Sequence, residues 1–192
     1  MICDEVDLTY VETAPYRFVA RSVLPVSPER LFDVWQSPEA WKKWVPVIKE
    51  VRWTSPLPPE VGSTRTVDMR GGISADEVFL AWTVGERMAF RFTEFSGSGI
   101  SAFAEDYRVS DLGLGQSKVE WTMAMDIGRK PGGLGEKVSG PILGFMLARM
   151  LKKFGKCAVA ALTNLSIVTC SEFELQPQIG REGRLSGAER NR

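Results

Sequence analysis

Short runs that mix apolar and β-branched residues recur along most of the chain, and this pattern is typical of antiparallel strands. The first run, Tyr16 to Leu24, ends directly before Pro25. Six further runs cover residues 47–54, 63–70, 73–83, 87–95, 100–109 and 117–127. Turns rich in Gly or Pro separate them, and no helix-period segment lies between the last five. The pattern therefore predicts an antiparallel meander and argues against a parallel βαβ sheet.

Two short helices are predicted between the first and second strands. Ser27 and Ser37 each precede a proline, and a serine cap followed by proline is a frequent helix start. Apolar residues between Leu31 and Trp35 then recur at helical spacing. The second helix should stop before Pro46, because the residue preceding a proline disfavours helical geometry.

The longest helical pattern covers residues 134–165. One face is basic and carries Arg149, Lys152, Lys153 and Lys156. The opposite face is apolar and carries Leu143, Leu147, Leu151, Phe154, Ala158, Ala161 and Leu165. Gly132, Gly133 and Gly135 are interpreted as a hinge or lid, and Gly140 and Gly144 as sites where the helix could kink.

This order of elements predicts an α+β fold. We expect a curved antiparallel seven-stranded sheet, two short helices after the first strand, and the long C-terminal helix over the concave face. A chain of 192 residues suits one domain, which we place at residues 16–165. Residues 1–15 are then an N-terminal extension, and the polar, aperiodic residues 166–192 are expected to be disordered.

Composition narrows the classes of partner. The formal net charge is +0, from 24 basic and 24 acidic side chains, so no nucleic-acid partner is expected. No apolar run reaches the length of a membrane span, and the acidic N-terminus is unlike a signal peptide. We therefore expect a cytoplasmic monomer or homodimer without stable membrane insertion.

Histidine is absent, and the three cysteines form no CxxC pair. The chain thus lacks the commonest metal ligand and any visible zinc motif, so neither a metal nor a cofactor is expected.

Five motifs occur along the chain in a characteristic order: the first helix start at residues 26–35, the SPEAWKKW segment at 37–44, VGS at 61–63, ERMAF at 86–90 and VEWT at 119–122. In this order they resemble the helix-grip START-like superfamily (SRPBCC), in its polyketide cyclase/dehydrase-like branch. In the second motif Ser37 stands where the family commonly has Asp. The resemblance covers residues 16–165 and implies a cavity between sheet and helix that holds a small hydrophobic molecule. It does not imply a particular reaction.

Strand alternation indicates which side chains face that cavity. In the last strand, Val119, Trp121, Met123 and Met125 form the more apolar face. In residues 73–83 both faces are apolar, and the assignment stays open. The residues expected to bind the ligand are Trp35, Arg65, Met69, Trp82, Phe90, Phe103, Glu105, Tyr107, Trp121, Met123, Met125, Met146 and Met150.

Two of these residues are also weak candidates for catalysis. Glu105 shares the inward face of its strand, where burial would raise its pKa unless a cation such as Arg65 lies nearby. It could orient a ligand hydroxyl or act as a general acid or base, or it could form a structural ion pair. Tyr107 could donate a hydrogen bond to a ligand carbonyl, or lie at the cavity mouth with its hydroxyl in water.

Three functions are consistent with the sequence. The first is the binding of a lipid, polyketide or similar hydrophobic metabolite. The second is a polyketide cyclase or dehydratase that acts by positioning its substrate. The third is a protein-interaction or assembly subunit, which predicts a filled interior.

Overall fold

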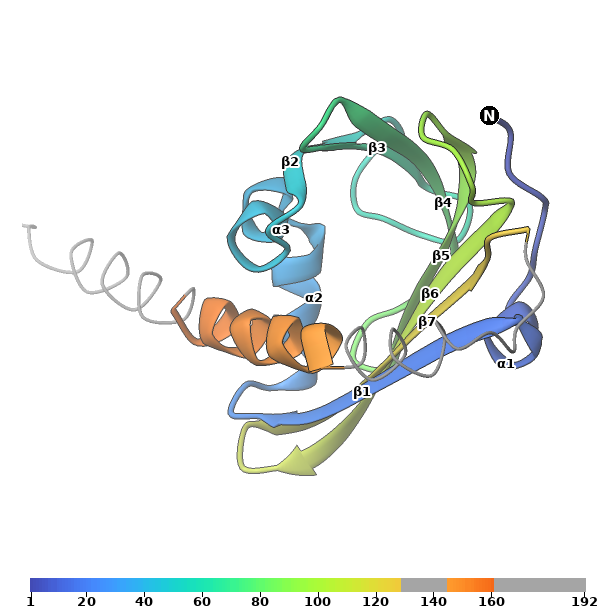
Figure 1. Cartoon of the computed structure of the whole chain (residues 1–192). Coiled ribbons are helices and arrows are strands. Elements are labelled where there is room, and N and C mark those ends of the chain that lie inside the picture. Colours follow the sequence, from blue (N-terminus) through green and yellow to red (C-terminus); the bar gives the residue numbers. More distant parts are fainter. Residues whose placement is uncertain (129–144, 161–192) are drawn as a thin grey trace, which may run out of the picture.

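The computed structural model describes residues 1–128 and 145–160, and its centre is one strongly curved antiparallel sheet (Figure 1). The seven strands lie in the order β1-β7-β6-β5-β4-β3-β2. Their bounds are β1 Tyr16–Leu24, β2 Ile48–Trp53, β3 Thr64–Met69, β4 Ile73–Thr83, β5 Arg87–Phe95, β6 Ala102–Gly113 and β7 Gln116–Asp126. The predicted fold class is confirmed, with β1 and β2 as the two edges of the sheet.

Two short helices connect these edge strands. They are α2 (Pro28–Gln36) and α3 (Pro38–Trp44), as predicted, and a proline lies in the first turn of each. Ser27 and Ser37 occupy the N-cap positions, but neither side chain forms the expected capping hydrogen bond. The prolines remove one unpaired N–H from each helix start and fix its backbone angle, which suffices to begin the helix.

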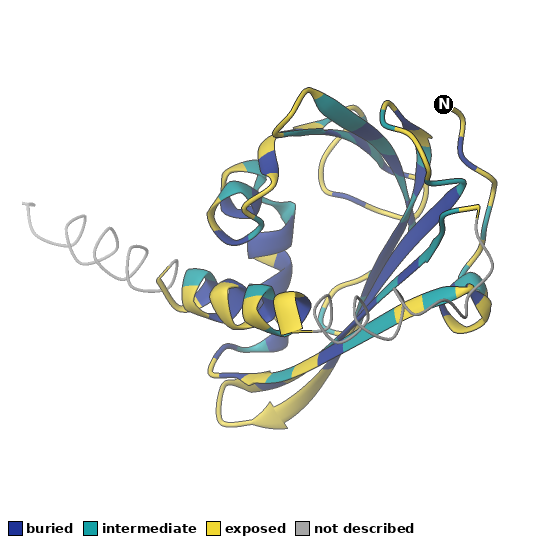
Figure 2. Ribbon diagram, viewed as in Figure 1, coloured by how far each residue is buried: buried dark blue, intermediate teal, exposed yellow. Residues whose placement is uncertain are grey.

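The C-terminal helix, residues 145–160, lies across the concave side of the sheet (Figure 1). Its predicted apolar face is confirmed where it is described, since Leu147, Leu151, Phe154 and Ala158 are fully buried. Gly155 allows the helix to approach β1 closely, because a β-carbon there would come within 2.5 Å of Leu24 Cδ2. All four basic residues of the predicted stripe are exposed, on the outward side of the helix (Figure 2).

Several sequence predictions lie outside the described residues. They concern the hinge at 132–135, the kinks at Gly140 and Gly144, the apolar positions Leu143, Ala161 and Leu165, and the tail at 166–192.

The N-terminal residues first pair with the end of β5 and then cover part of the convex side of the sheet. The Cys3 amide donates a hydrogen bond of 2.9 Å to the Thr93 carbonyl in β5. Further on, α1 (Tyr10–Thr13) packs Val11 against Ala104 and Ala124 in a second, smaller apolar cluster. Residues 1–15, predicted only as an extension, therefore belong to the packed structure.

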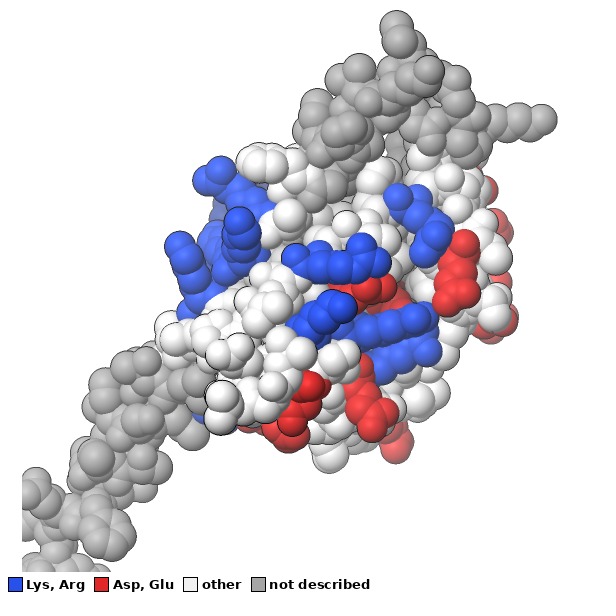
Figure 3. Space-filling view, turned by 90° about the horizontal axis from the view of Figure 1, so that it is seen from below, with Lys and Arg blue, Asp and Glu red and all other residues white. Residues whose placement is uncertain are grey.

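The surface carries charges of both signs close together, as Figure 3 shows for one face. Ion pairs such as Arg21 with Glu120, at 2.6 Å, link neighbouring strands on the outside. Within the described part of the chain, no helix is both long and apolar enough to cross a membrane.

The packing of α1 generates a stability prediction. Val11 is 2% exposed, whereas Thr13 in the same helix is exposed. Val11→Asp would bury an unpaired charge against Ala104 and Ala124, so the free energy of unfolding should fall by about 3 kcal/mol. Thr13→Asp adds the same charge in water and should change it by less than about 0.5 kcal/mol. Urea unfolding followed by circular dichroism measures both, and equal effects would contradict the packing of α1 on the sheet.

Candidate ligand cavity inside the curved sheet

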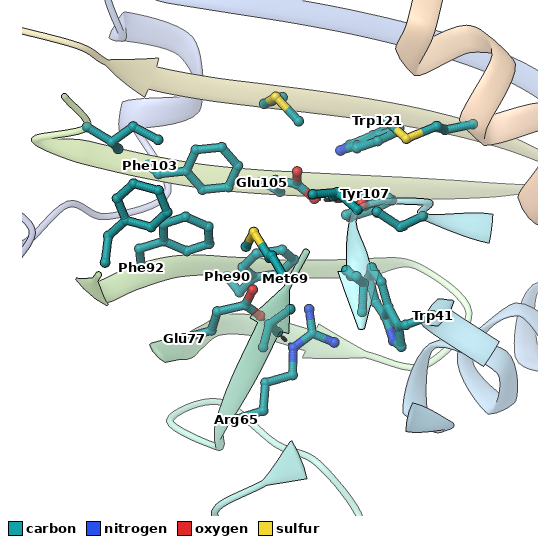
Figure 4. A pocket seen from close by; sticks show the side chains of 18 residues that line it. Trp41, Arg65, Met69, Glu77, Phe90, Phe92, Phe103, Glu105, Tyr107 and Trp121 are labelled. Carbon is teal, nitrogen blue, oxygen red and sulfur yellow. Dashed lines mark hydrogen bonds and ion pairs between the residues drawn. The ribbon is translucent and has the colours of Figure 1, made fainter. Parts of the chain in front are cut away.

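A cavity of about 230 Å³ lies within the curve of the sheet (Figure 4). Its wall comes from α3, from β2 to β7 and from the C-terminal helix. Most of the lining side chains are apolar: Trp41, Val45, Val47, Ile48, Val67, Met69, Phe90, Phe92, Phe95, Ile100, Phe103, Trp121, Met123 and Met150. Four polar side chains join them: Arg65, Glu77, Glu105 and Tyr107. The interior is therefore hollow and largely apolar, with a small polar group in its wall.

Strand alternation in β6 and β7 places one side of this wall. In β6, Phe103, Glu105 and Tyr107 follow at two-residue steps and all face the cavity. Glu105 lies opposite Met123 in the β6–β7 register, and Tyr107 lies opposite Trp121. The rings of Tyr107 and Trp121 stack with centroids 5.2 Å apart. The predicted inward face of these two strands is thus present, although Met125 does not reach the cavity.

The inward face of β4 could not be assigned from the sequence, because both faces of the strand are apolar. The buried residues Ala75, Glu77 and Phe79 alternate regularly with less buried ones. The register against β5 then shifts between Phe79 and Ala81, where Leu80 is the extra residue, and this shift changes the alternation by one residue. Phe79 and Trp82 therefore contact each other edge to face, with centroids 5.2 Å apart, although simple alternation would separate them.

The structure places nine of the thirteen expected ligand-binding residues on the cavity wall: Arg65, Met69, Phe90, Phe103, Glu105, Tyr107, Trp121, Met123 and Met150. The other four lie elsewhere. Trp35 is fully buried and stacks on Phe154, since α2 faces the C-terminal helix. Trp82 packs against Phe32 beyond the β4 irregularity, Met125 packs partly buried in the core, and Met146 is 52% exposed.

Arg65 is the unusual member of the wall. It is 1% exposed, and its Nε donates a hydrogen bond to Glu77, which lies directly opposite in the β3–β4 register. Its guanidinium also lies over aromatic rings, 4.2 Å from the centroid of Trp41 and 4.8 Å from that of Phe90. Such cation–π contacts and the ion pair together compensate a buried charge. Burial raises the pKa of the Glu77 carboxyl, and the charge of Arg65 opposes this rise.

Sequence reasoning missed Glu77 and Trp41. A glutamate inside a strand ordinarily faces water, and alternation groups Glu77 with Phe79 and Ala81 but leaves an apolar set on the other face as well, so it does not single out Glu77. Once the β3–β4 pairing is known, the cross-strand position of Glu77 opposite Arg65 provides the signal.

Glu105 is 6% exposed, and the Tyr107 hydroxyl donates a hydrogen bond of 2.6 Å to its Oε2. Burial raises the pKa of Glu105 to about 8, and the negative charge of Glu77 adds to this effect. The hydrogen bond from Tyr107, the charge of Arg65 and the nearby indole N–H of Trp121 act in the opposite direction. Desolvation wins because Arg65 is already paired with Glu77, so Glu105 is mostly protonated at neutral pH.

Tyr107 and Trp121 complete the polar part of the wall. Tyr107 is fully buried, which excludes the alternative that its hydroxyl lies in water at the cavity mouth, and its hydroxyl hydrogen is already donated to Glu105. The indole Nε1 of Trp121 points toward the Glu105 carboxyl (Figure 4) but does not meet the geometry of a hydrogen bond. Among the described residues, no group of three or more His, Cys, Asp and Glu side chains is arranged to hold a metal ion.

The raised pKa of Glu105 generates a prediction about pH. Between about pH 4.5 and 8, the folded protein retains a proton on Glu105 that the unfolded chain has released. The free energy of unfolding should therefore fall as the pH rises through this window, by a few kcal/mol. Glu105→Gln keeps the shape without the titration, so the difference between the wild-type and variant curves should follow this slope.

Glu94→Gln is the matched control, because Glu94 is an exposed carboxyl in the neighbouring strand β5. Urea unfolding at pH 5, 6, 7 and 8 measures all three proteins. A wild-type curve that stays parallel to the Glu105→Gln curve would show that Glu105 is ionised in the folded state.

Solved structures share this architecture. A protein from Thermus thermophilus superposes with a TM-score of 0.60 at 16% sequence identity, over 76% of this chain and 99% of that chain. A START superfamily protein from Mycobacterium smegmatis superposes with a TM-score of 0.56 at 12% identity, over 78% and 98% of the two chains. These likenesses show the helix-grip fold.

Sequence relatives and a family match identify the family of the chain. The chain is 45% identical over 150 residues to an uncharacterized protein of Mycobacterium bovis, which covers 78% of this chain and 89% of the relative. An uncharacterized protein of Mycobacterium tuberculosis matches equally well. Residues 16–165 match the family described as polyketide cyclase / dehydrase and lipid transport. With most of its length matched, the chain belongs to this polyketide cyclase / dehydrase and lipid transport family.

Proposed function

We propose that this protein binds a small hydrophobic molecule in the cavity inside the curved sheet. The observation that carries this proposal is a largely apolar space of about 230 Å³, whose wall, in the described part of the chain, contains four polar side chains among eighteen. An apolar cavity of about 150 Å³ is large enough to take up benzene. The expected ligand is therefore of the size of a compound with one or two rings, or a similarly small part of a larger lipid or polyketide.

The assembly-subunit alternative receives less support. A protein that uses this fold only as a scaffold gains stability by filling its interior, since close packing is the ordinary state of a core. The aromatic side chains here leave a space, while Phe92 and Phe103 stack on each other at 4.1 Å instead of filling it. The family description, with its reference to lipid transport, agrees with the binding of a hydrophobic molecule.

A second candidate is an enzyme of the cyclase or dehydratase type. Glu105 supports it, because a buried carboxyl group with a pKa of about 8 can donate or accept a proton near neutral pH. Substrate positioning in the cavity would supply the rest of the rate enhancement. Mass spectrometry of the molecule that co-purifies with the wild-type protein and with Glu105→Gln separates these functions. A binder carries the same molecule in both, whereas an enzyme accumulates unconverted substrate in the variant.

The cavity generates a matched mutational test. Val67 in β3 is 1% exposed and lines the cavity, whereas Val78 in β4 points to the outer face. Val67→Phe adds a ring inside the cavity and should lower the affinity for naphthalene by about tenfold or more, since overlap with the added ring has to be relieved. Val78→Phe adds the same volume outside and should leave the affinity unchanged. Isothermal titration calorimetry measures both, with thermal unfolding to confirm that each variant is folded.

Equal affinities of wild type and Val67→Phe for naphthalene would place its binding outside the cavity and contradict the proposal. The same holds if the wild-type protein binds neither naphthalene nor any co-purifying hydrophobic molecule.

A further inference from the structure

Two carboxyl groups in the cavity wall each keep one oxygen free. Glu77 accepts the hydrogen bond of Arg65 through Oε2, and Glu105 accepts that of Tyr107 through its own Oε2. Among the described residues, no donor bonds to Oε1 of either carboxyl, and neither atom belongs to the six unpaired N and O atoms that the protein encloses completely. Each Oε1 therefore keeps accessible surface, and both side chains line the cavity (Figure 4). The cavity thus offers two carboxyl oxygens to a ligand.

The charges of this wall are unbalanced when both carboxyl groups are ionised. Arg65 is the one basic side chain among the described residues that line the cavity, and Glu77 is its partner. A carboxylate on Glu105 would have no cation of its own, and an unpaired charge is costly in an apolar interior. Glu105 therefore holds a proton near neutral pH, where burial raises its pKa to about 8. Since Tyr107 donates to Oε2, this proton lies on Oε1, toward the cavity.

Polar groups on β3, β4, β6 and β7 surround Glu105. The Tyr107 hydroxyl and the Trp121 indole N–H favour its ionised form, as does the paired guanidinium of Arg65. The charge of Glu77 favours the protonated form. The other elements of the described wall, β2, β5, α3 and the C-terminal helix, contribute only uncharged side chains. A cation that belongs to the ligand can therefore supply the partner that the wall does not.

An ammonium group on a hydrocarbon body fits this wall. Its N–H groups can donate a charge-assisted hydrogen bond to Glu105 Oε1, and the charge of Glu77 attracts it as well. Phe103 and Tyr107 flank Glu105 on the same face of β6, and aromatic rings stabilise a nearby cation. Phe92 and Phe103 form an apolar end of the cavity for the hydrocarbon body (Figure 4).

We infer that the ligand is a small hydrophobic amine, whose ammonium group pairs with Glu105 through Oε1 and whose hydrocarbon body lies toward Phe92 and Phe103. This inference rests on the proposed function, because it concerns the same cavity. Binding is coupled to a proton: the protonated amine enters from water, and Glu105 releases its proton to water as the ion pair forms. The charge of the wall stays balanced, because one cation replaces another.

The test compares three compounds of nearly equal size: 2-aminotetralin, 2-tetralol and tetralin-2-carboxylate. The alcohol can donate and accept hydrogen bonds but carries no charge. Isothermal titration calorimetry at pH 7 should show the amine binding about tenfold more tightly than the alcohol, as expected when a charge-assisted hydrogen bond replaces a neutral one. The carboxylate should bind most weakly, because it adds a second unpaired negative charge.

An amine that binds no more tightly than the alcohol, or a carboxylate that binds most tightly, would overturn the inference and leave hydrophobic binding intact. Failure of all three compounds to bind would overturn the proposed function as well.

The exchange of a proton for the ammonium group has a pH signature. Because protons compete with the amine for Glu105, the affinity for 2-aminotetralin should rise about tenfold per pH unit between about pH 5 and 7, while that for 2-tetralol stays nearly constant. At pH 7 the heat of amine binding should differ between phosphate and MOPS buffers by the amount expected for about one released proton. Equal pH dependence for the amine and the alcohol would refute the exchange.

A matched pair of variants identifies the carboxyl group. Glu105→Gln keeps the shape of the wall and removes the charge, so it should bind 2-tetralol as the wild type does and lose the tenfold preference for the amine together with its pH dependence. Glu94→Gln is the control, because Glu94 is an exposed carboxyl in β5 outside the cavity lining, and it should leave all three properties unchanged. A preference for the amine that survives in Glu105→Gln would rule out Glu105 as the partner of the ammonium group.

Discussion

The ion pair between Arg65 and Glu77 sets the electrostatic character of the whole interior. A guanidinium that is 1% exposed requires a counter-charge, and the β3–β4 register supplies it directly opposite. The rings of Trp41, Phe79 and Phe90 surround the guanidinium, and their cation–π contacts stabilise its charge further. Because the charge of Arg65 is already matched, little of it is left to hold Glu105 in its ionised form. One pairing in the wall thus determines the protonation of a side chain on another strand.

The fold could be predicted from the sequence because its signals are local. Prolines and glycines mark nearly every boundary, so the bounds of β1, β4 and β5 and the starts of α2 and α3 agree closely with the structure. The packing of residues 1–15 could not be predicted, because α1 has only four residues and its place depends on contacts with Ala104 and Ala124 far along the chain. Local pattern carries no information about such pairings.

The cavity wall was predictable only where one face of a strand is clearly more apolar than the other. Simple alternation in β6 brings Phe103, Glu105 and Tyr107 to one face, and the structure agrees. In β4 both faces are apolar, so alternation could not show that Glu77 lies inside as the partner of Arg65. Trp35 shows a different limit: an apolar helix face indicates burial but does not tell whether the neighbour is empty space or another side chain, here Phe154.

The small cluster on the convex side has a mechanical consequence for the ligand site. Ala104 and Ala124 belong to β6 and β7, the strands that carry Glu105, Tyr107 and Trp121 on their opposite face. Val11 thus packs against these strands on the convex side of the sheet and supports the face that lines the cavity. A fusion partner attached ahead of Met1, or a trimmed N-terminus, would be expected to alter the shape of the binding space while touching none of the residues that line it.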